Sequence, residues 1–278
     1  MSYSVEAVRE ILSNLSVYEK SVWDKNVDET NVIEGYKAIR LNRDDKLIRL
    51  VSPDYNVIQH IDAFEATIKD LDELDLEYII KQVYVNDFET RNGKRRNSIQ
   101  VTFEFPELKF NVDGSDVNAT LEIFNSNDTS LMFTRKFGAF RQACQNIMCM
   151  GKGLFYERFK HVGTNDLGNM AEAIKDLPNY LKDFGKLVEQ TMTVTVDDKL
   201  KRGLVDLGFP KRLIDNLDVA ADKYKGLVGE DASPEKLWGV YQVLTNWISN
   251  VVMKTNIERA DRLGVLLYRF IQLQVANI

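Results

Sequence analysis

The sequence predicts an α+β fold, in which an N-terminal antiparallel sheet built of hairpins is followed by a helical C-terminal half packed on it. Between about residues 36 and 137, short segments of alternating apolar and polar residues are separated by polar turns, which is typical of antiparallel strands. After residue 138, apolar residues recur at helical spacing instead. Strands first and helices afterwards favour this fold class over alternating strand–helix units.

The composition is that of a globular protein with an acidic balance. The chain has 278 residues, 44% of them hydrophobic, and a formal net charge of −6. We divide it into a mainly β domain at residues 1–163, with one interrupting helix, and a helical region at residues 164–278 that packs as part of the same globule. No apolar run approaches the roughly 20 residues that cross a bilayer, and the N-terminus has no apolar signal core. We therefore expect a cytoplasmic protein without a membrane partner.

Three polar turns each separate two strand-like segments. They are RDD at residues 43–45, ETRNGKRRN at residues 89–97 and NDT at residues 127–129. The second contains Asn92 and Gly93, a pair that favours a tight hairpin because both residues tolerate positive φ. Each turn therefore predicts one hairpin of the sheet.

Helices are expected before, within and after the strand region. One amphipathic helix over residues 4–15 precedes the strands, and another over residues 61–74 interrupts them. The later helices are expected over residues 139–150, 168–192 with a break or kink at Pro178, 197–228 divided near Pro210, 233–252 with Ser233 as N-cap, and from 258 onward.

The cysteines and histidines do not form a recognisable metal or catalytic motif. Cys144 and Cys149 are five residues apart in the helix expected at 139–150, so they point to different sides of it. We expect both thiols to be reduced and mostly buried. Two histidines, His60 and His161, are too few for a histidine-rich metal site, and no family signature pairs Cys144 with His161.

One segment has the spacing of a phosphate-binding loop without its chemistry. GTNDLGNM carries Gly163 and Gly168 at the Walker A spacing, but Asn169 stands where the lysine is required. Without that lysine nothing reaches the β- and γ-phosphates of a nucleotide, so we expect no ATP-driven activity and no cofactor.

Cations are concentrated in two parts of this acidic chain. The turn at residues 89–97 holds four without an acid between them, and the segment at residues 133–161 holds six against Glu157 alone. Cations that follow a phosphate backbone, with rings on which bases stack, are typical of single-strand binding. The rings of the segment are expected to be mostly core, so the prediction rests on the cations. We predict nucleic-acid contacts by Arg91, Lys94, Arg95, Arg96, Arg135, Lys136, Arg141, Lys152, Arg158 and Lys160.

Two further patterns keep other interpretations open. Asp87, Glu107 and Lys109 resemble the acid, acid-x-lysine pattern of metal-dependent nucleases, in which two carboxylates hold a divalent cation. The same pattern also suits a solvated strand. The aromatic residues Trp238, Tyr241 and Trp247 fall at helical spacing, which favours core packing or a contact in a homo-oligomer.

Five segments in order along the chain carry a family resemblance. They are LVSPDYNVIQHIDAFEAT, LEIFNSNDTSLMF, GAFRQACQNIM, FKHVG and KLWGVYQVLTNWIS. Together they resemble the phage/plasmid-like protein family, a domain of unknown function carried by bacteriophages and plasmids, over roughly residues 35–255. The matching positions are Val51, Ser52, Tyr55, Val57, Ala63, Phe64, Asn125, Ser126, Asp128, Ser130, Arg141, Cys144, Asn146, His161, Trp238, Tyr241, Thr245 and Trp247.

The resemblance has departures and implies a setting more than a reaction. Thr129 and Ile147 stand where glycine is usual, and Gln242 replaces the usual asparagine. The implied setting is a mobile element in a host cytoplasm, among genes that handle DNA. The order of strand hairpins and a helix is also similar to phage single-strand-annealing recombinases, which work without ATP.

Three functions therefore remain as expectations. The first is a phage-encoded single-stranded DNA-binding protein, without an enzymatic activity, that promotes ATP-independent annealing or recombination. The second is an accessory protein that binds and inhibits a host defence protein, with acidic stretches such as DLDELDLE as mimics of nucleic acid. The third is a metal-dependent nuclease.

Overall fold

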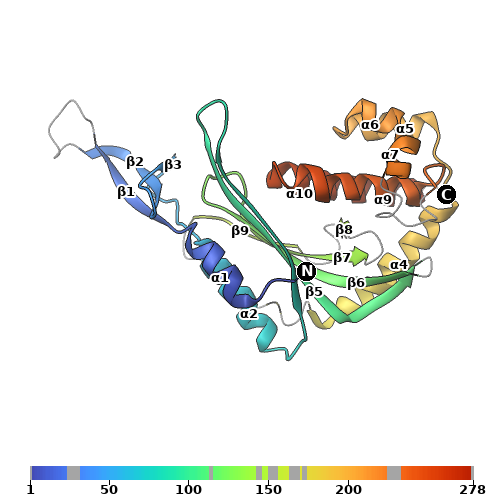
Figure 1. Cartoon of the computed structure of the whole chain (residues 1–278), viewed down its shortest axis with the longest axis horizontal. Coiled ribbons are helices and arrows are strands. Elements are labelled where there is room, and N and C mark those ends of the chain that lie inside the picture. Colours follow the sequence, from blue (N-terminus) through green and yellow to red (C-terminus); the bar gives the residue numbers. More distant parts are fainter. Residues whose placement is uncertain are drawn as a thin grey trace.

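The computed structural model describes residues 2–23, 32–112, 115–141, 146–149, 156–162, 170, 174–223 and 233–276. Its strands form two antiparallel sheets (Figure 1). The smaller sheet has the order β1 (Val17–Trp23), β2 (Val32–Leu41), β3 (Leu47–Val51). The larger sheet has the order β4 (Ile79–Glu89), β5 (Arg95–Val112), β6 (Ser115–Ser126), β7 (Phe133–Arg141), β8 (Asn146–Cys149), and β9 (Tyr156–Phe159) also pairs with β7.

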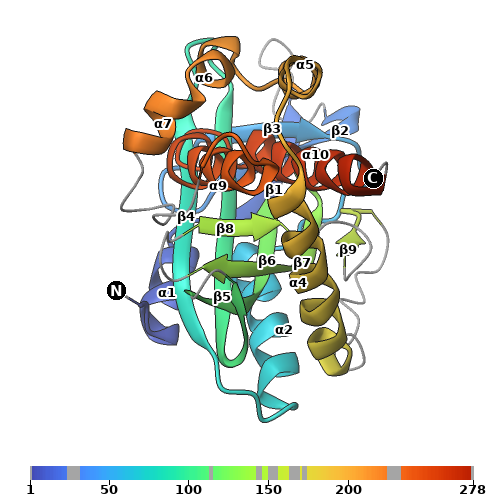
Figure 2. The same cartoon turned by 90° about the vertical axis from the view of Figure 1, so that its right-hand side faces the viewer.

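The helices lie on both sides of the larger sheet. The described helices are α1 (Val5–Ser13), α2 (His60–Asp72), α4 (Leu177–Thr193), α5 (Asp198–Asp206), α6 (Lys211–Asp215), α7 (Leu217–Lys223), α9 (Leu237–Trp247), the π-helix η1 (Ile248–Val252) and α10 (Ile257–Ala276). In Figure 1, α1 and α2 lie on one side of the sheet, and α9 and α10 lie on the other. Figure 2 shows α9 and α10 crossing over the long strands β4 and β5.

The predicted α+β class is confirmed, and the structure adds a second sheet to it. In the described part of the chain, strands end at Phe159 and helices occupy the chain from Leu177 onward. The helices predicted at residues 4–15 and 61–74 are present as α1 and α2. Among the strands that the structure describes, β1 to β3 pair only with one another, so the predicted sheet is divided.

The helix predicted at residues 139–150 is wrong. The chain continues as strand β7 to Arg141 and returns as β8, which pairs Gly138 with Cys149. Up to Ala139 the sequence keeps the period of two that its pairing with β6 requires, with Phe137 and Ala139 buried on one face. Cys144 lies outside the described residues and the side chain of Cys149 is not described, so the prediction of buried thiols stays a prediction.

The hairpin predicted around the turn at residues 89–97 is formed by β4 and β5. Glu89 pairs with Arg95, and the turn is closed by a hydrogen bond of 2.7 Å from Thr90 N to Lys94 O. Gly93 has a φ of 71°, the left-handed conformation that glycine adopts without steric cost. The Asn-Gly signal in the sequence therefore placed this turn correctly.

The two faces of the larger sheet differ in chemistry. One face is apolar and packs against α2, where the rings of Phe103 and Phe64 stack with their centroids 5.8 Å apart. The other face lies under the C-terminal helices, because Asn86 Oδ1 of β4 accepts a hydrogen bond of 3.1 Å from the backbone N–H of Ile257 at the start of α10. That second face is polar although it is buried. It carries Gln100, Thr102, Glu104, Asn118, Thr120, Glu122 and Lys136.

Candidate functional site

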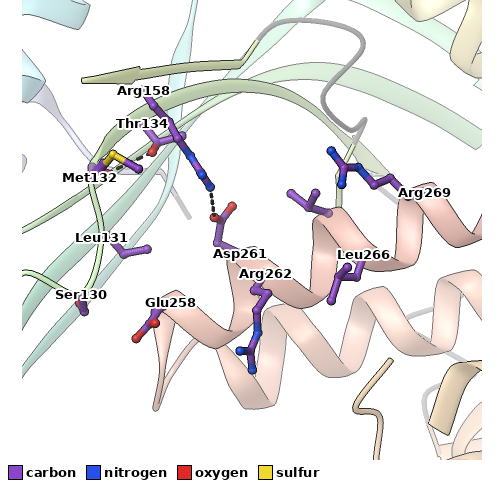
Figure 3. A pocket seen from close by; sticks show the side chains of 11 residues that line it. Ser130, Leu131, Met132, Thr134, Arg158, Glu258, Asp261, Arg262, Leu266 and Arg269 are labelled. Carbon is purple, nitrogen blue, oxygen red and sulfur yellow. Dashed lines mark hydrogen bonds and ion pairs between the residues drawn. The ribbon is translucent and has the colours of Figure 1, made fainter. Parts of the chain in front are cut away.

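A pocket of about 360 Å³ opens between the β7–β9 edge of the larger sheet and α10 (Figure 3). Three arginines line it: Arg158 comes from β9, and Arg262 and Arg269 come from α10. We call this site the basic pocket. Its full lining is Ser130, Leu131, Met132, Thr134, Arg158, Glu258, Asp261, Arg262, Val265, Leu266 and Arg269.

The helical period of α10 explains how its arginines reach the pocket. Arg262, Leu266 and Arg269 are spaced by four and three residues, so they lie on one stripe of the helix. Leu263 and Leu267 lie on a different stripe and are buried in the core. The same helix therefore anchors itself with one stripe and presents its cations with the other.

The charge at the floor of the basic pocket is largely compensated. Asp261 Oδ1 accepts a hydrogen bond of 2.7 Å from Lys136 Nζ, and Asp261 Oδ2 lies 3.9 Å from Arg158 Nη2. Within the described residues, Arg262 and Arg269 have neither an ion pair nor a hydrogen bond from their side chains. The three arginines that line the pocket therefore outnumber its two acids, Glu258 and Asp261, so the pocket favours an anion.

The basic hairpin lies next to this pocket through one side chain. Arg96 Nη1 lies 3.6 Å from Glu258 Oε2, at the pocket rim, and 3.7 Å from Asp128 Oδ2. Arg95 is nearly buried and pairs with Asp87 at 2.9 Å. At the tip, Arg91 and Lys94 are exposed and form no ion pair with any described residue. Of the four predicted hairpin cations, these two are therefore the ones whose charge is uncompensated.

Arg135 and Lys136 are buried, so in this arrangement they have no exposed charge to offer a phosphate. They are neighbours on β7 and therefore point to opposite faces of the sheet. Arg135 pairs with Asp70 of α2 at 2.7 Å and with Glu157 of β9 at 2.8 Å. The basic segment predicts both cations for a binding surface, because their acidic partners are distant in the sequence and do not appear beside them.

The remaining predicted cations are placed only in part. Arg158 is exposed at the basic pocket, and Lys160 is exposed after β9. Arg141 is described only by its backbone in β7, and Lys152 lies outside the described residues. The structure thus brings Arg158 together with Arg262 and Arg269, two arginines that the sequence reasoning missed. The signal that could have found them is the stripe of arginines on the last helix.

The described rings of the basic segment are not an exposed stacking platform. Phe133 and Phe137 are fully buried, and Phe159 stacks on Phe133 with centroids 5.2 Å apart. Phe155 lies outside the described residues, and the side chains of Phe140 and Tyr156 are not described. The apolar part of the basic pocket is instead aliphatic.

The acid, acid-x-lysine pattern does not form a common metal site. Asp87 pairs across the strands with Asn97, which is ten residues before Glu107 on β5, a separation of roughly 30 Å. Lys109 forms an ion pair of 2.9 Å with Asp116 instead. Among the residues that the structure describes, no three histidine, cysteine, aspartate or glutamate side chains gather to hold a metal.

A buried polar cluster at the other end of β5 includes Asn125, one of the matching positions of the resemblance. His60 Nε2 lies 3.0 Å from Asn97 Oδ1, and Asn125 Nδ2 lies 3.0 Å from His60 Nδ1. Asn127 Nδ2 donates to Asn97 Oδ1 at 2.8 Å. Burial lowers the pKa of His60 to about 4, so this imidazole is neutral at pH 7.

The second histidine packs beside this cluster. The ring of His161 stacks in parallel on Tyr55 with centroids 5.1 Å apart, and its Nδ1 accepts a hydrogen bond of 3.4 Å from the backbone N–H of Ile58. Burial lowers the pKa of His161 and raises the pKa of Tyr55. Tyr55, Asn125 and His161 belong to motifs that are far apart in the sequence. Their contacts meet here and hold the segment before α2 against the larger sheet.

The fold and the site define a class: an α+β protein with a two-faced antiparallel sheet and a basic pocket under its last helix. The chain belongs to the family described as a domain of unknown function, DUF932, whose model matches residues 48–266. No curated protein and no solved structure matches the chain. None of the described helices, including the 20-residue α10, combines the length and the apolarity that a bilayer crossing requires.

Proposed function

We propose that this protein binds single-stranded DNA through the basic pocket and the adjoining hairpin tip. The observation that carries the proposal is that Arg158, Arg262 and Arg269 all line one pocket. Cations that replace the counterions of a phosphate backbone gain free energy from counterion release. Two of these arginines are not committed to ion pairs within the described chain, so their charge is available to a ligand.

The shape and lining of the basic pocket favour an unpaired nucleotide over a duplex. A volume of about 360 Å³ lies within the range of small-ligand sites and accommodates one nucleotide. Leu131, Met132 and Leu266 offer apolar contact to the face of a base. A base paired within a duplex has both faces covered by stacking and cannot enter such a recess.

The hairpin extends the contact along the strand. Arg91 and Lys94 at its tip are exposed, and Arg96 connects the base of the hairpin to Glu258 at the pocket rim. A strand bound in the pocket can therefore continue toward these cations. If a second strand paired with the bound one, the protein would act as an annealing factor that needs no ATP. Such an activity suits the phage setting implied by the resemblance. It also suits a homo-oligomer whose subunits bind side by side along the DNA.

The test is equilibrium binding of labelled oligonucleotides. We expect tight binding of single strands, weaker binding of duplexes, and affinity that falls linearly in a double-logarithmic plot against salt. The double variant Arg262→Ala/Arg269→Ala should weaken single-strand binding about tenfold at about 100 mM salt and flatten the salt slope by about 1.4. Arg202→Ala, which removes an exposed arginine from α5, is the matched control and should change neither quantity.

A second candidate function rests on the smaller sheet. Tyr36, Leu47 and Leu50 are exposed by 57%, 44% and 48%, and Leu50 lies on the same face of the sheet as Ala38, its partner on β2. Exposed apolar side chains gathered on one sheet face mark protein contacts. This favours the accessory protein that binds and inhibits a host protein. A pure host partner whose binding, measured by calorimetry, is lost in Leu47→Asp/Leu50→Asp but retained in Arg262→Ala/Arg269→Ala would establish it.

A further inference from the structure

Strand β4 forms one edge of the larger sheet, and Figure 2 shows it at the margin of that sheet. Among the described strands only β5 pairs with it. On its outer side, Tyr3 N donates one hydrogen bond of 2.9 Å to Ile80 O, and the N-terminal segment then turns away into α1. Beyond this single bridge, no described residue pairs with the outer side of β4. An unpaired edge of this kind is a template for another strand.

The hairpin turn fixes which backbone groups of β4 point outward. The hydrogen bond from Thr90 N to Lys94 O makes these two residues a hydrogen-bonded pair, and such pairs recur at every second residue of an antiparallel ladder. The residues between them direct their N–H and C=O groups away from β5; they are Val83, Val85, Asp87 and Glu89. Asn97, which lies opposite Asp87, agrees with this assignment, because its carbonyl accepts a hydrogen bond of 2.9 Å from Asn127 N on the side away from β4.

A pocket of about 330 Å³ lies at the same edge, and we call it the edge pocket. Residues 81–84 of β4 form one wall, and residues 2–4 and Ala7 form the other. Because the N-terminal segment lies beside β4, a pocket between the two opens at the edge of the sheet. Gln82 Oε1 is buried there without a hydrogen-bond partner in the described part of the chain, and the partly buried ring of Tyr84 offers apolar contact.

The strand that lines the edge pocket also carries an exposed aromatic side chain. Phe88 is 40% exposed and lies on the same face of β4 as Tyr84, since the register with β5 is unbroken from Gln82 to Glu89. Within one molecule, Phe88 cannot reach the pocket, because four residues of a strand span about 14 Å. In a second copy that pairs antiparallel about Asn86, however, Phe88 lies directly opposite Tyr84 of the first copy.

We propose that two copies of this chain pair through β4 about a twofold axis at Asn86, with Phe88 of each copy beside Tyr84 of the other at the edge pocket. In this register Val85, which is 36% exposed, exchanges backbone hydrogen bonds with Asp87 of the second copy. No like charges lie opposite each other between residues 83 and 89. The same patch serves both copies, as a twofold interface requires, and the two larger sheets become one.

Sedimentation equilibrium of the full chain over a range of concentrations tests this pairing. We expect a reversible equilibrium between monomer and dimer in the parent. Val85→Pro removes an outward N–H that the pairing with β5 does not use, so an edge strand tolerates it. The dimer loses that hydrogen bond and gains a steric clash, so its Kd should rise at least about tenfold.

A second variant tests the side-chain contact without a change in the backbone. Phe88→Ala removes the ring from the edge pocket, and the dimer Kd should again rise about tenfold. Val219→Ala is the control, because it removes an apolar side chain that is 65% exposed on α7, and it should dimerise as the parent does.

Circular dichroism checks the fold of each variant, and Phe88→Ala decides if the proline variant is unfolded. The proposal is overturned if the parent sediments as a monomer at every concentration. It is also overturned if the folded variants at Val85 and Phe88 dimerise as tightly as the parent.

Discussion

Lys136 Nζ of β7 donates a hydrogen bond of 2.7 Å to Asp261 Oδ1 of α10, and both side chains are almost completely buried. The ammonium also lies 4.4 Å from the centroid of the Phe124 ring, which adds a cation–π contact. This pair fixes the last helix to the centre of the sheet and sets the floor of the basic pocket.

Lys136→Met should destabilise the protein by about 3–5 kcal/mol, because it leaves Asp261 buried without its closest cation. The double variant Lys136→Met/Asp261→Leu should cost less than Lys136→Met alone, since Asp261 no longer remains as a buried charge without its closest cation; Glu122, 3.8 Å from Lys136, loses its cation in both variants. Urea unfolding of the two variants and the parent measures both values. A loss below about 1 kcal/mol for Lys136→Met would show that the pair does not hold α10.

Cations that are exposed in the basic segments should contribute to the affinity for DNA, whereas the buried cations of the same segments should not. Arg91→Ala/Lys94→Ala removes two exposed charges at the hairpin tip, so it should flatten the salt dependence of single-strand binding by about 1.4. The free energy of unfolding should change by less than about 0.5 kcal/mol, because turn cations without ion pairs add little stability. Fluorescence anisotropy at several salt concentrations measures the slope, and the parent's slope in this variant would remove the hairpin from the interface.

The buried His60 should make stability depend on pH below neutrality. Its pKa falls from the ordinary 6.5 to about 4 on folding, so the unfolded chain binds the proton more readily. The contribution of neutral His60 to stability is therefore complete above pH 6.5, is lost as the pH falls toward 4, and amounts to about 3 kcal/mol in all. Urea unfolding at pH 7.5, 6 and 5 should show a steeper loss for the parent than for His60→Gln. Parallel curves for the two proteins would contradict the shift.

Thr129 should be a position where a single substitution adds stability. It has a φ of 65°, a left-handed conformation that is strained for a β-branched residue, and it stands where the family resemblance expects glycine. Thr129→Gly should stabilise the protein by about 1 kcal/mol, and Thr129→Ala, which keeps a Cβ, should gain less. Thermal unfolding decides the order; an equal or lower Tm for the glycine variant would show that the turn is not strained.

Local features of this fold could be predicted from the sequence, and pairings between distant residues could not. The hairpin turn at Gly93 was predicted because its signal lies in two adjacent residues, and α1 and α2 follow from apolar residues at helical spacing. The opposite placement of Arg135 and Lys136 was missed because their partners Asp70 and Asp261 are 65 and 125 residues away. A period of two shows that neighbours on a strand face opposite ways, but not that both faces are covered.

The candidate site likewise contains residues that the sequence predicted and residues that it did not. The clustered cations of the hairpin and of β9 are visible in the sequence, and Arg91, Lys94 and Arg158 are exposed in the structure. Arg262 and Arg269 were overlooked because they are dispersed along α10 and form a cluster only when the helix lies against β7 and β9. The buried polar face that carries Asn118, Thr120 and Glu122 was not predicted, since the sequence does not show that helices cover it.

The core on one face of the larger sheet is held by different interactions from the core on the other face, so the two sides should open locally at different free energies. The side toward α2 is held by apolar area, which resists salt and mild acid. The side toward α10 combines a buried apolar stripe of that helix with ion pairs and hydrogen bonds, and these polar contacts weaken together when one of them is lost. Backbone amides of α10 are therefore expected to exchange with deuterium before those of α2, so that the last helix can detach and reseat while the rest of the sheet keeps its shape.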